Sequence, residues 1–162
     1  MSTAPLDMEG SQVKRDWLFN YLKVPYAVRV YVVERMLRLW LSDKEAGSLT
    51  DYICSVFVDD SIPEGLEETL RPEDVEKGRA LFDRYGCISC HIVGSGGGYV
   101  GPQLNNIGDR LKAGWIFAWL KNPQKYKPKT LQPDYGFSDN EAMALTAFLT
   151  SLTKESGEKG GS

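Results

Sequence analysis

The chain has 162 residues, of which 42% are hydrophobic and 25% are charged, and its formal net charge is −3. This size and composition fit a globular protein of one domain or two small ones, and exclude a collagenous or wholly disordered chain. The acidic balance argues against non-specific nucleic-acid binding. Three cysteines cannot all pair internally, which excludes a disulfide scaffold, and a single histidine excludes any site that needs two.

Both ends of the chain are predicted to be flexible tails, 1–11 and 154–162, because they are polar and rich in small residues. The first ten residues have no basic and apolar pattern of a secretory signal. The least polar longer stretch, 24–41, contains four charged side chains, so we expect no membrane-spanning segment.

The predicted elements are helices. Apolar periodicity indicates helices at 12–23 and 110–121, and each ends just before an X-Pro step. Ser42 and Ser138 each begin an S-x-x-E capping box that opens a further helix. Pro72, followed by two acidic residues, predicts the start of another helix that runs to about residue 85. With no convincing strand alternation, the sequence predicts an all-α fold.

Two segments of the chain look like copies of each other. Residues 16–53 align with 114–149 with one two-residue gap, and eleven identities fall in the same order. This favours an internal repeat over two unrelated pairs of amphipathic helices. We therefore expect a partial repeat at 12–58, a turn-rich linker at 59–72 and a complete domain at 73–153.

The pattern Cys87-x-x-Cys90-His91 is the haem c attachment signature. Two thiols one helical turn apart can add to the two vinyl groups of haem, and the adjacent histidine can bind the iron. A redox dithiol would need a βαβ surround, which is missing. A zinc site could recruit Cys54, but adjacent cysteine and histidine side chains rarely both reach one tetrahedral ion.

The C-terminal half, about 73–152, resembles the small class I c-type cytochromes. Besides the haem signature, the resemblance rests on the following residues: Gly78, Phe82 and Tyr85 in a first helix, Gly101-Pro102-x-Leu104, the run from Trp115 to Pro123, and Phe148 in the last helix. It implies a class I cytochrome c fold with one covalent haem c, and His91 as the proximal iron ligand. It also implies that the Pro102 carbonyl accepts the histidine N–H, and that Leu104 and Trp115 lie at the cofactor.

One position departs from the family pattern. The methionine that the family usually supplies as the sixth iron ligand is replaced by Gln132, six residues before Ser138. In the N-terminal repeat Met36 lies six residues before Ser42, so the half without the haem signature has the methionine. One hypothesis is that Gln132 is a weak distal ligand or leaves the position to water, which lowers the reduction potential.

Two other hypotheses concern Met36. This residue, or a group from a partner, could fill the sixth position, or Met36 could bind a second haem that a partner chain completes. Against these stands a simpler interpretation, in which Met36 is a core residue of a degenerate repeat used for docking.

The resemblance implies one-electron transfer rather than catalysis by the chain alone. We expect a subunit of a larger respiratory or photosynthetic membrane complex, such as a cytochrome bc-like complex or an oxidoreductase, with redox proteins as partners and no nucleic acid. The alternative is a haem sensor or enzyme with an open sixth position. The resemblance also implies a periplasmic or extracytoplasmic location, on the membrane through partners, and Cys54 is then a leftover thiol.

Overall fold

The computed structural model describes residues 6–28 and 36–154. The described chain is mostly helical, with one short hairpin. Its elements are α1 (Glu9–Gln12), α2 (Arg15–Lys23), α3 (Asp43–Val56), the 3₁₀ helix η1 (Leu66–Thr69), α4 (Pro72–Arg84), the 3₁₀ helix η2 (Cys87–Ser89), β1 (Ile92–Val93), β2 (Gly96–Gly97), α5 (Ile107–Arg110), α6 (Ala113–Lys121), α7 (Pro123–Tyr126) and α8 (Asp139–Ser151).

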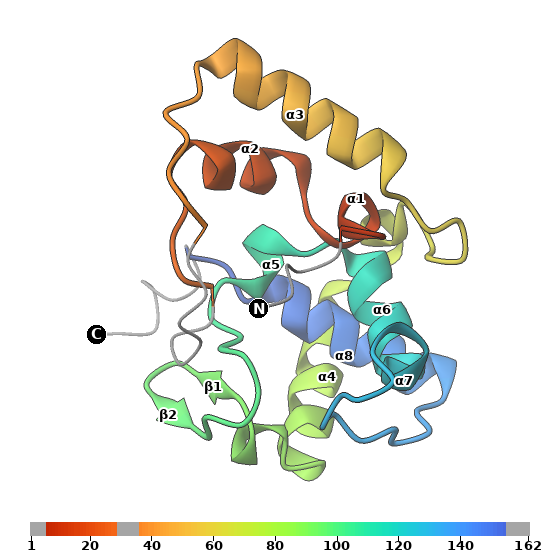
Figure 1. The fold of residues 1–162 in the computed structure, drawn as a ribbon. Helices are drawn as coiled ribbons and strands as arrows, with labels where there is room; N and C mark the ends of the chain where they lie inside the picture. The colour runs from red at the N-terminus through yellow and green to blue at the C-terminus, as the bar shows by residue number, and fades with distance from the viewer. Residues whose placement is uncertain (1–5, 29–35, 155–162) are drawn as a thin grey trace.

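The helices form two groups (Figure 1). In the view shown, α2 and α3 lie together at the top, α4, α6, α7 and α8 lie below, and α1 and α5 lie between them. The larger core is below, where α4 crosses α8 and α6 packs on α8. Gly78 makes the crossing close, because a Cβ at this position would lie 2.0 Å from the carbonyl oxygen of Ala144. Beside it the rings of Phe82 and Phe148 are in contact, with centroids 5.3 Å apart.

Where the sequence has a local chemical signal for the start of a helix, the structure has a helix that starts there. Both capping boxes are formed: the Ser42 hydroxyl accepts the backbone N–H of Glu45, and the Ser138 hydroxyl accepts that of Glu141. These bonds satisfy backbone donors that the first helical turn leaves unpaired. Helix α4 begins at Pro72, as predicted, and ends at Arg84, one residue before the expected end.

The helices predicted at 12–23 and 110–121 start three residues later than predicted. Gln12 and Arg110 end the short helices α1 and α5, an extended residue follows each, and α2 and α6 begin only at Arg15 and Ala113. Val13 and Leu111 pair there as an isolated antiparallel bridge. A pairing between residues so far apart in sequence overrides the local helical preference.

The predicted tail and linker are more closely packed than expected. Gly10 and Ser11, in the predicted tail 1–11, belong to α1 and are buried. Within the predicted linker, Ile62 is buried and a Glu67 carboxylate oxygen accepts the N–H of Ala113, 2.7 Å away, at the start of α6. These segments therefore join the two groups of helices.

Other sequence-based expectations are settled only in part. Residues 1–5 and 155–162 of the predicted tails, and 29–35 of the least polar stretch, lie outside the described residues. None of the helices in the described ranges is long and apolar enough to cross a membrane. The hairpin of β1 and β2 was not predicted, and two residues per strand are too few to give an alternating pattern.

Candidate functional site

The Cys87–His91 segment follows directly on α4. Gly86 ends the helix in the left-handed conformation, with φ of 64°, and the chain then turns through η2. The backbone N–H groups of Cys90 and His91 both donate to the Cys87 carbonyl, at 3.2 and 3.0 Å. Cys87 is half-buried against the larger core, which raises the pKa of its thiol by desolvation, whereas Cys90 is exposed.

The His91 ring is held from two sides. Its Nδ1 lies 2.7 Å from the Pro102 carbonyl oxygen. A carbonyl can only accept, so the ring proton is on Nδ1 and Nε2 presents a lone pair. Gly101 packs against the ring, since a Cβ there would lie 2.4 Å from Cε1, and its own N–H donates to the Cys90 carbonyl at 2.7 Å. The ring is therefore fixed in tautomer and in orientation.

Gln132 faces this histidine. Its Oε1 lies 3.4 Å from His91 Nε2. Imidazole nitrogen and amide oxygen are both groups that can bind a metal ion, and here they face each other at this distance. The donor set thus fits a haem iron.

Neighbouring residues position Gln132. The Gln124 side-chain amide, in α7, donates to the Gln132 carbonyl at 2.8 Å, and the Gln132 N–H donates to the Thr130 hydroxyl at 3.2 Å. Sequence reasoning missed Gln124, because nothing local distinguishes it from a surface glutamine. It also missed Tyr135, whose ring packs on Phe137 with centroids 5.3 Å apart and whose pKa is raised by desolvation.

The other residues expected at the cofactor lie in different places. Leu104 is buried in the larger core, and its N–H donates to the Ile92 carbonyl just beyond the histidine. Trp115 is buried in a separate cluster with Ile62, and its ring centroid lies 4.8 Å from that of Tyr126. Met36 is in the upper group of helices, 40% exposed, in the segment before α3.

A zinc site finds no support in the geometry. Within 6–28 and 36–154 no three His, Cys, Asp or Glu side chains come together as a metal-binding group. Cys54 packs in the small core of the upper helices, where desolvation raises the pKa of its thiol. The third cysteine is therefore separate from the other two.

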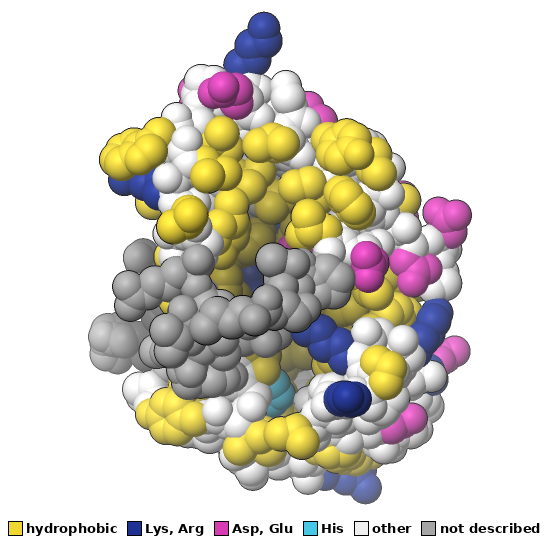
Figure 2. Space-filling view, viewed as in Figure 1, with side chains coloured by type: hydrophobic (Ala, Val, Ile, Leu, Met, Phe, Trp, Pro, Cys, Tyr) yellow, Lys and Arg dark blue, Asp and Glu magenta, His cyan; other side chains and the backbone are white. Residues whose placement is uncertain are grey.

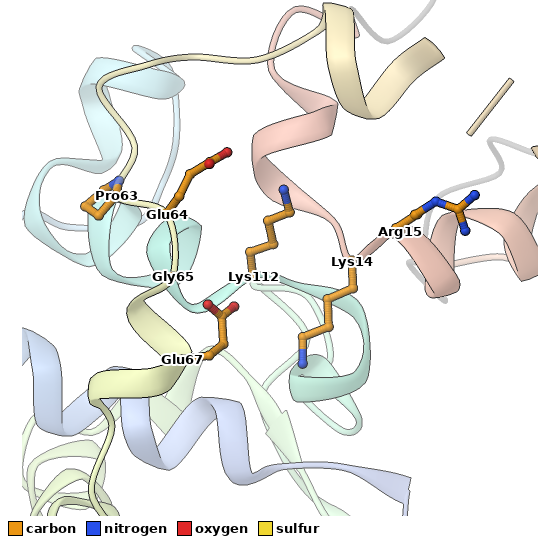
Figure 3. A pocket seen from close by; sticks show the side chains of 7 residues that line it. All are labelled: Lys14, Arg15, Pro63, Glu64, Gly65, Glu67 and Lys112. Atoms are coloured by element: carbon orange, nitrogen blue, oxygen red, sulfur yellow. The ribbon is translucent and has the colours of Figure 1, made fainter. Parts of the chain in front are cut away.

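An open cleft of about 370 Å³ lies where the two groups of helices meet (Figure 3). Charged side chains line it, but several have structural partners. Lys14 Nζ donates to the Gly108 carbonyl at 2.6 Å, and Glu67 accepts the Ala113 N–H. In Figure 3 the Arg15 side chain points away from the others. Residues from both halves of the molecule line the cleft, and His91 is not among them.

Comparison with known proteins finds relatives of the C-terminal half. The family model for cytochrome c matches residues 75–153. Subunit 2 of the cytochrome c oxidase of Alkalihalophilus pseudofirmus is 36% identical over 85 residues, which are 47% of this chain and 25% of that protein. One subunit of the nitric oxide reductase of Halomonas halodenitrificans is 30% identical over 87 residues, 48% of this chain and 57% of that protein.

The corresponding nitric oxide reductase subunit of Stutzerimonas stutzeri is 25% identical over 100 residues, which are 58% of this chain and 68% of that protein. The matches thus span between a quarter and about two thirds of these relatives. No solved structure gives a significant match. The family match and the helical fold agree, so residues 75–153 are a class I cytochrome c domain, of the family that binds haem c covalently.

Proposed function

We propose that the chain is an electron-transfer subunit in which Cys87 and Cys90 bind haem c through thioether bonds and His91 binds its iron through Nε2. The observation that carries this is the histidine ring, whose Nδ1 proton goes to the Pro102 carbonyl and whose free lone pair faces Gln132. Haem c supplies a one-electron Fe(III)/Fe(II) couple.

The protein orients the His91 imidazole and places a polar side chain, Gln132, opposite it. The Pro102 carbonyl makes the imidazole a stronger donor, and Gly101 keeps the ring from turning. The side-chain oxygen of Gln132 is the candidate sixth ligand, held through its backbone by Gln124. A hard oxygen donor favours ferric iron, so we expect a lower reduction potential than with histidine and methionine ligation.

The variant Gln132→Met tests this assignment in the haem-bearing protein. We expect the unaltered chain to lack a sulfur–iron charge-transfer band, and the variant to gain that band together with a higher midpoint potential. Leu131→Met is the matched control, since it adds a thioether at the preceding residue, whose side chain is 80% exposed, and should give neither change. A sulfur–iron band in the unaltered chain, measured apart from its partners, would contradict the assignment, and its loss in Met36→Ala would identify Met36 as the ligand.

The glutamine at this position also supports a second candidate, a haem sensor or enzyme with a labile sixth position. Carbon monoxide separates the two. Rapid binding to the reduced protein would favour the sensor or enzyme, whereas a low-spin haem that does not react would favour electron transfer.

The setting that we propose is a larger respiratory membrane complex, on its periplasmic or extracytoplasmic side, where the chain is held by partner subunits. The proposal is supported by the relatives, whose names describe subunits of nitric oxide reductase and of cytochrome c oxidase. Salt washing of isolated membranes tests it. A chain held by partner subunits should stay with its complex and leave the membrane only with it.

A further inference from the structure

The two halves of the molecule meet as symmetric copies. Helices α1 and α2 have the same lengths as α5 and α6, and the bridge between Val13 and Leu111 lies at their centre. On either side of this bridge the Lys14 N–H donates to the Arg110 carbonyl at 2.8 Å, and the Lys112 N–H donates to the Gln12 carbonyl at 2.9 Å. Lys14 and Lys112 are 98 residues apart, and so are Gln12 and Arg110. The two hydrogen bonds therefore join equivalent residues in opposite directions.

The likeness continues into α3 and α8. Each has a buried threonine whose hydroxyl donates to the carbonyl one turn earlier, Thr50 to Ala46 at 2.8 Å and Thr146 to Ala142 at 2.7 Å. Each first turn also pairs with the last lysine of the preceding nine-residue helix, as Lys23 with Asp43 and Lys121 with Asp139. The helix pair α2–α3 is therefore built like α6–α8.

The chain also approaches both helices in the same way. Two residues before the capping serine, Trp40 has φ of 54° and Gly136 has φ of 63°. A left-handed tryptophan is unusual, so its agreement with a glycine at the equivalent position points to a common backbone course. Counting back from this point, Met36 holds the position that Gln132 holds in the cytochrome domain.

Among the described residues, 6–28 and 36–154, no helix covers α3 as α4 covers α8. In the lower half α4 covers α8, so Leu145 and Phe148 are only 1% and 4% exposed. The equivalent side chains of α3, Leu49 and Tyr52, are 40% and 56% exposed, and Val56 one turn further is 51% exposed. In the described part of the chain α3 packs mainly on α1 and α2. Figure 2 shows hydrophobic side chains gathered on the upper half of the molecule.

We propose that this face of α3 and Met36 are half of a second haem site, and that a partner chain supplies the other half. The cytochrome domain shows what the missing piece must be: a helix with a small residue at the crossing, followed by C-x-x-C-H with its covalent haem. The helix would cover Leu49, Tyr52 and Val56 as α4 covers α8. The thioether of Met36 would then lie where Gln132 lies opposite His91.

The test uses the chain purified with its natural partners from its own membranes. We expect a second c-type haem, attached to another polypeptide, and a sulfur–iron charge-transfer band. Met36→Leu should abolish the band, whereas Met143→Leu, the matched change within α8, should keep it. Tyr52→Glu places a charge on the proposed contact and should release the second haem-bearing polypeptide.

Several results would overturn the proposal. One is an assembly with a single c-type haem, and another is a band that Met36→Leu leaves unchanged. A third is a self-associated chain that Tyr52→Glu separates into single copies, because a second copy would then cover the face. The mass of the chain with its own covalent haem, measured on the same samples, tests the Cys87–Cys90 attachment separately.

Discussion

The close crossing of α4 and α8 predicts a large effect for one added methyl group. In Gly78→Ala the new Cβ would lie 2.0 Å from the Ala144 carbonyl oxygen, 2.6 Å from its carbon and 2.7 Å from Phe148 Cβ. Two of these three atoms belong to the backbone and cannot rotate away. Since real Cβ contacts do not fall below 3.0 Å, the two helices must separate by about 1 Å.

The cost of that separation can be worked from packing energies. A buried side chain of leucine size makes 40–60 contacts of about 0.1–0.2 kcal/mol each, and a gap of 0.5–1 Å loses roughly a quarter to a half of this. From the middle of these ranges, about 7.5 kcal/mol in all, one displaced side chain loses about 2–4 kcal/mol. Alanine returns about 1 kcal/mol through its higher helix propensity. The free energy of unfolding should fall by about 1–3 kcal/mol.

Urea unfolding of the haem-bearing protein, followed by circular dichroism and haem absorbance, measures this difference. The matched control is Gly47→Ala in α3, where no atom lies within 4 Å of the added Cβ. It should raise the free energy of unfolding by about 1 kcal/mol. If Gly78→Ala were as stable as this control, the helices would not be in the contact described, and the reasoning would fail.

Three further predictions follow from other sites. Gly101→Ala, whose Cβ would lie 2.4 Å from the His91 ring, should disturb iron ligation and shift the haem absorbance spectrum; an unchanged spectrum would contradict the packing. Hydrogen bonds from Ser138 lower the pKa of Glu141, so the stability they give is present above its ordinary value near 4.5 and is lost as pH falls through the lowered one. Glu141→Gln should therefore show a shallower loss of stability with acid, measured as urea midpoints at a series of pH values. The unfolded haem-bearing protein should expose one reactive thiol, from Cys54, and Cys54→Ser should expose none in a thiol-reagent titration.

The sequence predicted best what is decided locally. The Ser42 and Ser138 capping boxes and the proline start of α4 depend on side chains within one helical turn, and all three were located from spacing alone. The starts of α2 and α6 were wrong because the bridge between Val13 and Leu111 joins segments far apart in sequence. A single-sequence pattern contains no information about such a partner.

The candidate site follows the same division. The motif gave Cys87, Cys90 and His91 because the attachment chemistry needs them side by side in the sequence. The glutamine opposite the histidine was predicted from the family pattern, with the register taken from the repeat that we expect at 12–58. The hydrogen bond from Gln124 to the Gln132 carbonyl depends on how α7 packs, and no residue pattern in the sequence predicted it.

The different side chains at the two equivalent positions lead to a last prediction, which rests on both proposals above. Sulfur ligation by Met36 raises the potential of a haem, and oxygen ligation by Gln132 lowers it. In the purified assembly a redox titration should therefore show two one-electron steps, with electrons passing from the haem at Gln132 to the one at Met36. Gln132→Met should raise the lower step alone, and Met36→Leu should lower the upper step alone. If both variants moved the same step, the two side chains would share one iron, and the two-site arrangement would be wrong.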